Sequence, residues 1–469
     1  MPVQHTPVYV TEAERLEQEN AARQVRDLPE RPRTYHIVTY GCQMNAHDSE
    51  KLAGILSGMG MAEAADRREA DLVIFNTCCV RDNAERRALG NVTWLKELKK
   101  DKPGLIIGVC GCMVQQPGMA ERILRQYRFI DLAFGTHNLH RLPSLLLALL
   151  TQKTRVVSVT DEENLIAEDL PVKRLNAWHA YITIMYGCDN FCSYCIVPYV
   201  RGRERSRDPE RIIDEVRELV ADGFREITLL GQNVNSYGKD LGTGYDFADL
   251  LTDLDKIDGD YLIRFMSSQP KDATYKLFDA MAGCRHVAKQ LHLPVQSGCD
   301  RVLRAMNRPY DVAKYLDLIT YARRVMPELV LTSDVIIGFP GETESEAMET
   351  VALVEKVRFD ALFTFIFSPR PGTPAAKMED PVPREEKQRW FDRLCAVQNG
   401  ISEELHRQYV GQTLRCLVDG ESDDARWPLT ARTAGGRLVH CTGDRADLGE
   451  YRDIKITDSN TWALFGTIE

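Results

Sequence analysis

Three cysteines stand close together in the middle of the chain: Cys188, Cys192 and Cys195, in a CxxxCxxC pattern. Cysteine thiolates are the protein ligands of iron–sulfur clusters, and a [4Fe–4S] cluster commonly takes four of them. Three thiolates this close can hold such a cluster and leave one iron without a protein ligand. The spacing therefore predicts a [4Fe–4S] cluster whose open iron binds a small molecule.

The open iron indicates which small molecule binds there. S-adenosylmethionine (SAM) can chelate an iron through its amino and carboxylate groups, and a reduced cluster can pass one electron to its sulfonium. That step releases a 5′-deoxyadenosyl radical. The alternative is a structural zinc site, which usually has four closed ligands. No nearby Cys or His is an obvious fourth ligand, since His179 lies in the expected preceding strand, so the spacing favours the cluster.

A second set of cysteines is spread along the N-terminal part of the chain: Cys42, Cys78 and Cys112. Each follows the end of an apolar stretch expected to be a strand, and these strands are Thr34–Tyr40, Asp71–Asn76 and Leu105–Val109. In a parallel α/β sheet the carboxyl ends of the strands share one edge, where ligands bind. The pattern predicts that the three thiols meet there and hold a second metal cluster.

Two neighbouring cysteines leave the choice of ligands open. Cys79 adjoins Cys78, and Cys110 lies two residues before Cys112, so spacing alone cannot choose between the members of each pair. Cys110 falls inside the expected strand, which favours a buried apolar thiol. The remaining cysteines have no ligand spacing and are expected in the core: Cys284, Cys299, Cys395, Cys416 and Cys441.

Strands and helices alternate from Thr34 onward, which predicts a doubly wound parallel sheet in an N-terminal domain of residues 33–165. The expected helices are Ala46–Gly58, Asn83–Lys99, Gly118–Arg125 and Asn138–Leu150, and a further strand is expected at Phe129–Phe134. Residues 1–32 are charged and contain no convincing strand, so we expect a flexible extension. Residues 151–177, with the acidic Asp161–Glu163, are interpreted as a polar connector.

A second alternating region is expected over residues 166–400, and its strands are Tyr181–Met185, Glu226–Leu230, Tyr261–Met266, Lys289–Leu293, Leu329–Ile336 and Ala361–Phe367. Six strand–helix repeats are fewer than a full eightfold barrel needs, which predicts a partial (β/α)6 barrel. A long helix over about Pro383–Tyr409 ends this region. Short β-like stretches over residues 401–469 predict a small β-barrel.

The motifs around these cysteines resemble the radical-SAM superfamily, and more narrowly its methylthiotransferases, from Tyr35 to the C-terminus. The motifs that carry this resemblance are Tyr40-Gly-Cys42-Gln-Met-Asn45, Asp48-Ser-Glu50, Asn76-Thr-Cys78 with Val80-Arg81, and Gly111-Cys112-Met113 with Gln115. The resemblance implies that Cys42, Cys78 and Cys112 hold an auxiliary [4Fe–4S] cluster with an open iron, so that the protein carries two clusters. The terminal β-barrel resembles a TRAM domain.

Several segments after the barrel strands resemble the superfamily's SAM contacts. The residues expected to bind SAM are Gln232, Asn233, Ser268, Gln296, Asp334, Gly338 and Phe339. The alternative for glycines such as Gly338 and Gly341 is a plain strand-to-helix turn. Because all these segments point to the same mouth of the barrel, the group predicts a SAM site.

The resemblance also implies a substrate. The Tyr40–Asn45 motif has the form typical of the branch that methylthiolates C2 of N6-dimethylallyladenosine next to the anticodon, at tRNA position 37, using two SAM molecules. The alternatives are the same chemistry on a ribosomal protein or on threonylcarbamoyladenosine in tRNA. An alternative of another class is a non-catalytic iron–sulfur RNA-binding protein, which leaves the Cys188–Cys195 pattern unexplained. The implied partners are the tRNA anticodon stem-loop, a reducing protein such as a flavodoxin or ferredoxin, and a donor of sulfur or clusters.

Charge restricts how RNA is bound. With 59 Lys and Arg against 69 Asp and Glu, the formal net charge is −10, so we expect a local basic patch rather than broad non-specific binding. Arg201, Arg203, Arg205 and Arg207 follow the cysteine triad at alternate positions. They are interpreted as a grip on phosphate or an anionic cofactor group. The equal alternative is a solvated loop whose arginines pair with neighbouring acids.

The composition favours a cytoplasmic protein without a membrane segment. Apolar residues make up 44% of the chain, and no run approaches about eighteen of them, the length that spans a bilayer. The N-terminal residues are polar and acidic, unlike a signal peptide. In such a protein thirteen cysteines favour metal binding or catalysis over disulfides.

Overall fold

The computed structural model describes residues 8–79, 82–160 and 165–469. Within this range the chain forms two compact units. The first unit runs to Leu175 and also includes Met185–Asp189 and Cys195–Ser206, and the second contains the remaining segments up to Glu469. The motif residues Val80 and Arg81 and the acidic Asp161–Glu163 lie outside the described residues.

A six-stranded, all-parallel sheet forms the centre of the first unit. Its strands, in order across the sheet, are β3 (Ala62–Glu63), β2 (Thr34–Thr39), β4 (Leu72–Thr77), β5 (Ile106–Gly111), β6 (Leu132–Phe134) and β7 (Val156–Ser158). The prediction of a doubly wound parallel sheet is confirmed. The short strands β3 and β7 were not predicted.

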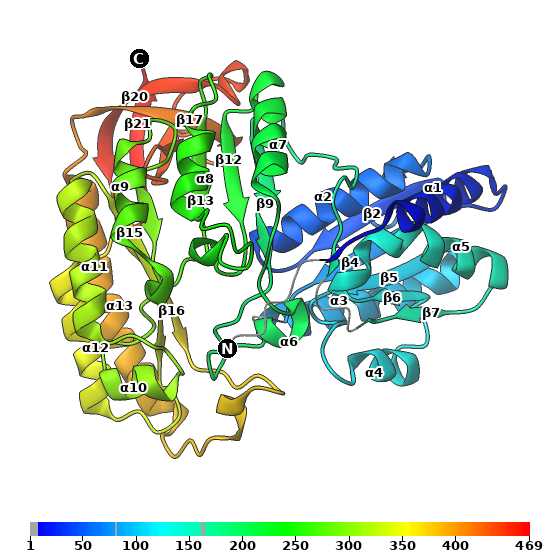
Figure 1. The fold of residues 1–469 in the computed structure, drawn as a ribbon, viewed down its shortest axis with the longest axis horizontal. Helices are drawn as coiled ribbons and strands as arrows, with labels where there is room; N and C mark the ends of the chain where they lie inside the picture. Colours follow the sequence, from blue (N-terminus) through cyan, green and yellow to red (C-terminus); the bar gives the residue numbers. More distant parts are fainter. Residues whose placement is uncertain (1–7, 80–81, 161–164) are drawn as a thin grey trace. The chain divides into compact units, whose positions relative to one another are not determined.

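Helices cover both faces of this sheet (Figure 1). On one face α2 (Gln43–Gly58) and α5 (Leu142–Gln152) pack on strand residues such as Ile74 and Phe134. On the other face α3 (Asp82–Asp101) and α4 (Met119–Gln126) belong to a core that contains Phe75 and Val109. Neighbouring strand residues point to opposite faces, so the apolar strands serve two cores.

The N-terminal segment is attached to the first unit from Val8 onward. Helix α1 (Glu12–Asp27) begins with a capping box between Thr11 and Glu14, and its buried Val25 belongs to the same core as α5. The short strand β1 (Val8–Tyr9) pairs with β8 (Leu165–Ile166). The expectation of a flexible extension is wrong for these residues, because the hydrophobic side of α1 packs against α5.

The second unit contains six parallel strands in chain order: β9 (His179–Thr183), β12 (Glu226–Leu230), β13 (Leu262–Phe265), β14 (Gln290–His292), β15 (Val330–Ile337) and β16 (Ala361–Ile366). A bridge between Ile263 and Val287 joins the two groups of three strands. The strands are connected by α7 (Pro209–Ala221), α8 (Phe247–Leu254), α9 (Tyr275–Gly283), α10 (Asp300–Ala305), α11 (Val312–Val325) and α12 (Glu344–Val357). This is the predicted partial (β/α)6 barrel.

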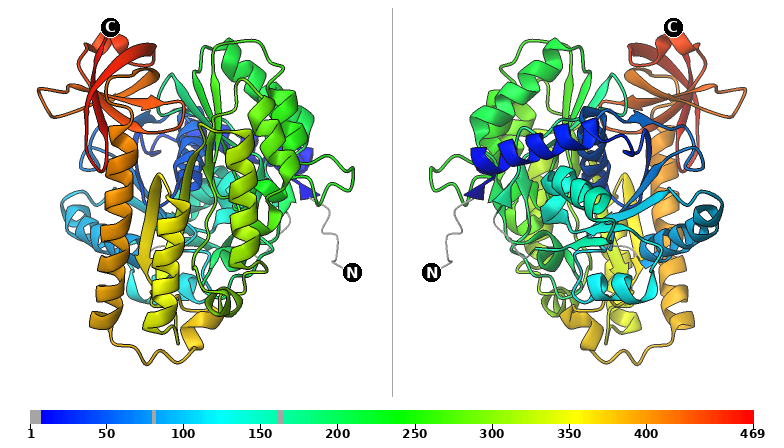
Figure 2. Two further views of the ribbon diagram at one scale, coloured as in Figure 1. Left: turned by 90° about the vertical axis from the view of Figure 1, so that its left-hand side faces the viewer. Right: turned by 90° about the vertical axis from the view of Figure 1, so that its right-hand side faces the viewer.

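Helix α13 (Arg384–Arg407) leads to a closed five-stranded barrel at the C-terminus (Figure 2). The barrel strands, in spatial order, are β17 (Thr413–Glu421), β18 (Leu429–Thr433), β19 (Leu438–Cys441), β21 (Leu464–Ile468) and β20 (Tyr451–Ser459). Arg264 donates to the carbonyls of Thr433 and Ala434 at 2.8 Å each, and buried Arg437 pairs with Asp360. These bonds fasten the small barrel to the larger one.

The shorter elements include β10 (Met185–Tyr186), β11 (Arg205–Ser206) and α6 (Val197–Arg201) in the first unit. The 3-10 helices are η1 (Thr136–Arg141), η2 (Val234–Ser236), η3 (Pro270–Asp272), η4 (Pro374–Lys377) and η5 (Arg445–Asp447). Among the described residues, no helix combines the length and the apolarity that crossing a membrane requires.

Candidate functional site

Cys42, Cys78 and Cys112 each follow the carboxyl end of a strand of the first unit, namely β2, β4 and β5. Asn45 lies between two of them: its Oδ1 is 3.7 Å from the Cys42 Sγ and 4.0 Å from the Cys112 Sγ. Its amide nitrogen donates to the carbonyls of Tyr40 and Thr77 at 3.0 Å each. The end of the sheet therefore delivers these thiols to one place, and Asn45 is fixed among them.

Gly41 permits the close approach of Cys78. Its φ of +123° is unfavourable for side-chain-bearing residues, and a Cβ added here would lie 2.4 Å from the Cβ of Cys78. The Cys78 thiol in turn forms a hydrogen bond with Cys42. A larger residue at position 41 would displace the Cys78 side chain from its neighbour.

The two additional cysteines of this region have different surroundings. Cys110 lies in the core beneath α2 and α5, and burial raises the pKa of its thiol well above the usual value. Cys79, in contrast, is buried against Cys112 and forms a hydrogen bond with it. The structure thus separates Cys110 from the other thiols, as predicted from its place inside a strand, and brings Cys79 to them.

The environment favours thiolates at this edge of the sheet. The hydrogen bond from Cys78 and the charge of Arg201 lower the pKa of Cys42 to about 6. The hydrogen bond from Cys79 and the nearby Arg201 lower the pKa of Cys112. The thiolate is the form of cysteine that binds iron. The donor set and its electrostatics therefore fit an iron–sulfur cluster.

Arg201 lies among the auxiliary thiols, a place that the sequence did not indicate. Its side chain is buried, and its Nε donates to the Cys112 Sγ at 3.1 Å. Its Nη2 donates to Asp48 Oδ2 at 2.8 Å and to Asn45 Oδ1 at 3.1 Å. The interpretation of Arg201 as a grip on phosphate is wrong, because its buried guanidinium is bound to protein groups. Its interpretation as a grip on an anionic cofactor group stays a prediction.

The other arginines of the series also bind protein groups. Arg205 is buried, donates to backbone carbonyls and lies over the ring of Tyr186. Arg207 pairs with Glu215 at 3.0 Å, and the exposed Arg203 lies 3.4 Å from an oxygen of Asp189. The alternative of arginines paired with neighbouring acids describes Arg203 and Arg207.

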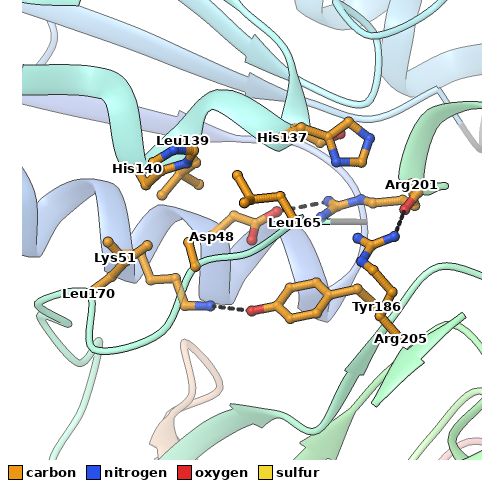
Figure 3. A pocket seen from close by; sticks show the side chains of 12 residues that line it. Asp48, Lys51, His137, Leu139, His140, Leu165, Leu170, Tyr186, Arg201 and Arg205 are labelled. Atoms are coloured by element: carbon orange, nitrogen blue, oxygen red, sulfur yellow. Dashed lines mark hydrogen bonds and ion pairs between the residues drawn. The ribbon is translucent and has the colours of Figure 1, made fainter. Parts of the chain in front are cut away.

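A small cavity of about 50 Å³ lies beside Arg201 and Asp48 (Figure 3). Lys51 reaches across it to the hydroxyl of Tyr186 at 3.4 Å. Burial, with the charges of Arg205 and Arg201, lowers the pKa of His137 to about 3. The imidazole is therefore neutral at physiological pH. A cavity of this size has room for a few water molecules beside Arg201 and Asp48.

Cys188 and Cys195 lie in the first unit, and Cys195 comes two residues before the start of α6 at Val197. The N–H of Cys188 donates to the Gly202 carbonyl at 3.1 Å, and both thiols are partly accessible. Gly187 has a φ of +75°, and a Cβ there would lie 1.8 Å from the Arg203 carbonyl oxygen. Only glycine allows the chain to turn this tightly before Cys188.

Cys192 belongs to the second unit and is buried. Gln269, after β13, donates from Nε2 to its Sγ at 3.8 Å. The adjacent backbone is held by Met306, whose carbonyl accepts from the N–H of Ser193 at 2.9 Å, and by Asn307, which donates to the Phe191 carbonyl at 2.9 Å. These contacts hold Cys192 at the carboxyl end of the barrel strands.

Two polar atoms near Cys192 fit a polar ligand. The Oγ of Ser268 and the Oε1 of Gln269 are buried and have no hydrogen-bond partner among the described residues. A buried polar atom without a partner is costly, so such atoms indicate a missing ligand or water. Ser268 was predicted to bind SAM, whereas Gln269 was not among the predicted SAM residues.

The other predicted SAM residues divide into two kinds. The first kind keeps polar side chains near the strand ends. Asn233 donates a hydrogen bond to Asp272 at 2.7 Å, and Gln232 is half-buried. Gln296 has a φ of +71°, and its N–H donates to the carbonyl of Asp334. Asp334 remains partly exposed, with one carboxylate oxygen 3.6 Å from His292. This arrangement leaves polar side chains near the barrel mouth.

Gly338 and Phe339 have structural tasks. Their N–H groups donate to Glu342, and a Cβ on Gly338 would lie 2.4 Å from Lys387. Phe339 packs in the core against Phe367, with ring centroids 5.3 Å apart. The alternative of a strand-to-helix turn describes Gly338, and contact of Gly338 and Phe339 with SAM stays a prediction.

No three His, Cys, Asp or Glu side chains of the described segments surround a point that would hold a single metal ion. The ligands of a [4Fe–4S] cluster need not do so, since each thiolate binds a different iron.

We expect Cys78→Ala and Cys112→Ala to lose the auxiliary cluster and Cys110→Ala to keep it, since only Cys110 lies in the core away from the other thiols. Cys79→Ala should also keep the cluster, although Cys79 contacts Cys112. Iron analysis after anaerobic reconstitution should give about eight irons per chain when both clusters are present and about four when one is lost. Loss in Cys79→Ala with retention in Cys78→Ala would reverse the assignment.

Comparison with known families gives three matches along the chain. Residues 34–135 match the uncharacterized protein family UPF0004, residues 182–354 match the radical SAM superfamily, and residues 407–468 match the TRAM domain. Each match lies within one of the predicted domains.

Similar curated proteins cover nearly the whole chain. A tRNA-2-methylthio-N(6)-dimethylallyladenosine synthase of Acetivibrio thermocellus is 47% identical over 468 residues, which is 98% of each chain. Proteins of the same name from Clostridium botulinum and Thermoanaerobacter are 49% and 47% identical over 92% and 99% of this chain, and over 96% and 98% of their own.

Solved structures with this fold are more distant. The radical S-adenosylmethionine methyltransferase TsrM from Kitasatospora setae has a TM-score of 0.53 and 15% identity, and the match covers 84% of this chain and 79% of that protein. The cobalamin-dependent S-adenosylmethionine radical enzyme OxsB has a TM-score of 0.50 and 14% identity, covering 80% of this chain and 56% of its own. At these identities the likeness concerns the fold.

Proposed function

Since the chain belongs to the family of tRNA-2-methylthio-N(6)-dimethylallyladenosine synthases, we propose that it replaces the hydrogen at C2 of N6-dimethylallyladenosine, next to the anticodon of tRNA, with a methylthio group. The observation that carries this proposal is the 47% sequence identity with the Acetivibrio thermocellus synthase, which extends over 98% of both chains. It is a radical-SAM tRNA methylthiotransferase, and its family implies SAM and a [4Fe–4S] cluster as cofactors.

The proposal assigns two clusters to the chain. Cys188, Cys192 and Cys195 would hold the cluster that binds SAM, and the three strand-end cysteines of the first unit would hold the auxiliary cluster. When bound, these groups supply the electron, the 5′-deoxyadenosyl radical and the methylated sulfur, with two SAM molecules used in each turnover. The cofactors supply the reactive chemistry, and the chain binds, orients and shields them.

The residues around Cys192 would orient the first cluster and its SAM. The amide of Gln269 holds the Cys192 sulfur by a hydrogen bond, and its free Oε1, with the Ser268 Oγ, offers acceptors to the amino group of SAM. Polar groups that are already fixed cost little entropy when the ligand binds. Asn233, after β12, and Asp334, within β15, would complete the polar lining.

The auxiliary cysteines would be kept away from bulk water. Cys78 and Cys112 are buried, Asn45 and Arg201 contact the Cys112 thiol, and Arg201 also lines the small cavity. A second layer of hydrogen bonds of this kind fixes the orientation of ligands around a metal centre. Cys42, which is exposed, would lie on the open side, where sulfur and substrate arrive.

The proposed partners are tRNA, a reducing protein such as a flavodoxin or ferredoxin, and a donor of sulfur or clusters, all of which would meet the protein in the cytoplasm. The TRAM domain supports RNA as the substrate. On its barrel the indole of Trp462 is 73% exposed, which leaves a ring free to stack on a base.

The proposal is tested by mass spectrometry of tRNA nucleosides from a strain that lacks the gene. We expect the 2-methylthio nucleoside to disappear and its unmodified dimethylallyladenosine precursor to accumulate. Wild-type protein and Cys395→Ala should restore the modification, since Cys395 lies on α13, whereas Cys192→Ala should not. Persistence of the methylthio group in the deletion strain would contradict the proposed function.

A further inference from the structure

The guanidinium of Arg201 lies against an auxiliary cysteine. Its Nε is 3.1 Å from the Cys112 Sγ, and its side chain is 7% exposed. Figure 3 shows Arg201 reaching from its helix to Asp48, whose Oδ2 accepts a hydrogen bond from the guanidinium. A full positive charge is therefore held next to one of the proposed cluster ligands.

The surrounding chain fixes Arg201 in this position. It is the last residue of α6, whose Val200 packs with Ile196 on Cys79 and Cys112. The Val200 carbonyl accepts from Thr136 Oγ1 at 2.7 Å, so the helix is tied to η1. Since backbone and side chain are both held, the direction of the Nε–H bond toward sulfur is preorganised.

Two opposing charges set the local electrostatics. Arg201 brings a positive charge and a hydrogen bond to the Cys112 sulfur, while Asp48, 2.8 Å from the guanidinium, brings a negative charge behind it. Reduction adds an electron to an iron–sulfur cluster, and hydrogen bonds to sulfur and nearby positive charge stabilise the added charge. These effects are strong at a buried site because little water screens them.

We propose that Arg201 is a positioning residue for the auxiliary cluster, which holds the Cys112 thiolate by its Nε–H bond and raises the reduction potential of the cluster, with Asp48 limiting that increase. This inference rests on the proposed function, because it takes Cys42, Cys78 and Cys112 to be cluster ligands.

The test uses the full chain with Cys188, Cys192 and Cys195 all changed to alanine, so that only the auxiliary cluster remains. In this background, Arg201→Met removes the charge and the hydrogen bond, Arg201→Lys keeps a charge without the guanidinium, and Asp48→Asn removes the opposing charge. Arg203→Met is the matched control, since Arg203 is exposed and lies on the same segment. A redox titration followed by electron paramagnetic resonance measures the potential of each reconstituted protein.

We expect a more negative potential in Arg201→Met, a smaller shift of the same sign in Arg201→Lys, a more positive potential in Asp48→Asn and no shift in Arg203→Met. A merely structural role would lower iron content in all three site variants without shifts of opposite sign. If Arg201→Met fails to hold iron, the reduction potential of Asp48→Asn tests the inference instead. A more positive potential in Asp48→Asn supports the inference, and an unchanged potential overturns it.

The two proposals fail in different ways. If the background protein holds no iron after reconstitution, the assignment of the auxiliary cluster fails and the inference falls with it. If the background protein holds about four irons and all variants share one potential, the cluster stands and the role of Arg201 is overturned.

Discussion

Changing Cys188, Cys192 and Cys195 together to alanine is expected to abolish formation of 5′-deoxyadenosine while about four irons per chain remain. The radical requires an electron from a cluster whose open iron binds SAM, and these thiols are the proposed ligands of that cluster. The auxiliary cysteines lie at the end of another sheet, with their own hydrogen bonds to Asn45 and Arg201. They should therefore keep their iron when the triad is lost.

The measurement combines iron analysis with detection of 5′-deoxyadenosine after anaerobic reconstitution and chemical reduction. Cys284→Ala is the control, because Cys284 is a buried thiol that contacts the carbonyl of Leu251 and lies at the end of α9. It should form 5′-deoxyadenosine as the wild type does. Retained cleavage of SAM in the triple variant would refute the assignment, and loss of all iron would indicate one shared cluster.

The second large effect concerns the substrate. An anticodon stem-loop with N6-dimethylallyladenosine should be a much better substrate than the same stem-loop with unmodified adenosine. Burying each carbon of the five-carbon dimethylallyl group contributes about 0.8 kcal/mol, or about 4 kcal/mol in full. That difference corresponds to a ratio of kcat/KM of up to about 1000-fold.

Matched stem-loops that differ only in the prenyl group are compared in single-turnover and steady-state assays, beside a ribosomal protein and a threonylcarbamoyladenosine stem-loop. Equal kcat/KM values for the prenylated and bare adenosine would remove the prenyl preference. Turnover of the ribosomal protein alone would replace tRNA as the substrate. The Cys188, Cys192 and Cys195 triple variant supplies the blank for every substrate.

Much of the fold was predictable because local patterns and topology agree. The strands end where the cysteines begin: β2 ends at Thr39 before Cys42, and β4 ends at Thr77 before Cys78. A parallel sheet then brings residues distant in sequence to one edge. The partial barrel was predicted by counting six strands, which pair in chain order within two groups of three.

Sequence patterns did not predict the features that depend on tertiary contacts. The spacing of Arg201 to Arg207 is the same for a surface loop and for a buried one, and only the packing of α6 shows that Arg201 and Arg205 are buried. Helix α1 is polar on most of its surface, so its attachment depends on a few residues such as Val25. The choice between Cys78 and Cys79 was not determined by strand alternation, since β4 ends at Thr77 before either residue.

The inclusion of Cys195–Ser206 in the first unit has a consequence for how the protein is made. A nascent chain that ends at Leu175 already contains every strand of the parallel sheet, but it lacks α6 and Arg201. Ile196 and Val200 therefore cover Cys79 and Cys112 only after the ribosome has released that later segment. Until then these thiols are open both to proteins that deliver iron and sulfur and to oxidants. Emergence of α6 from the ribosome closes this interval.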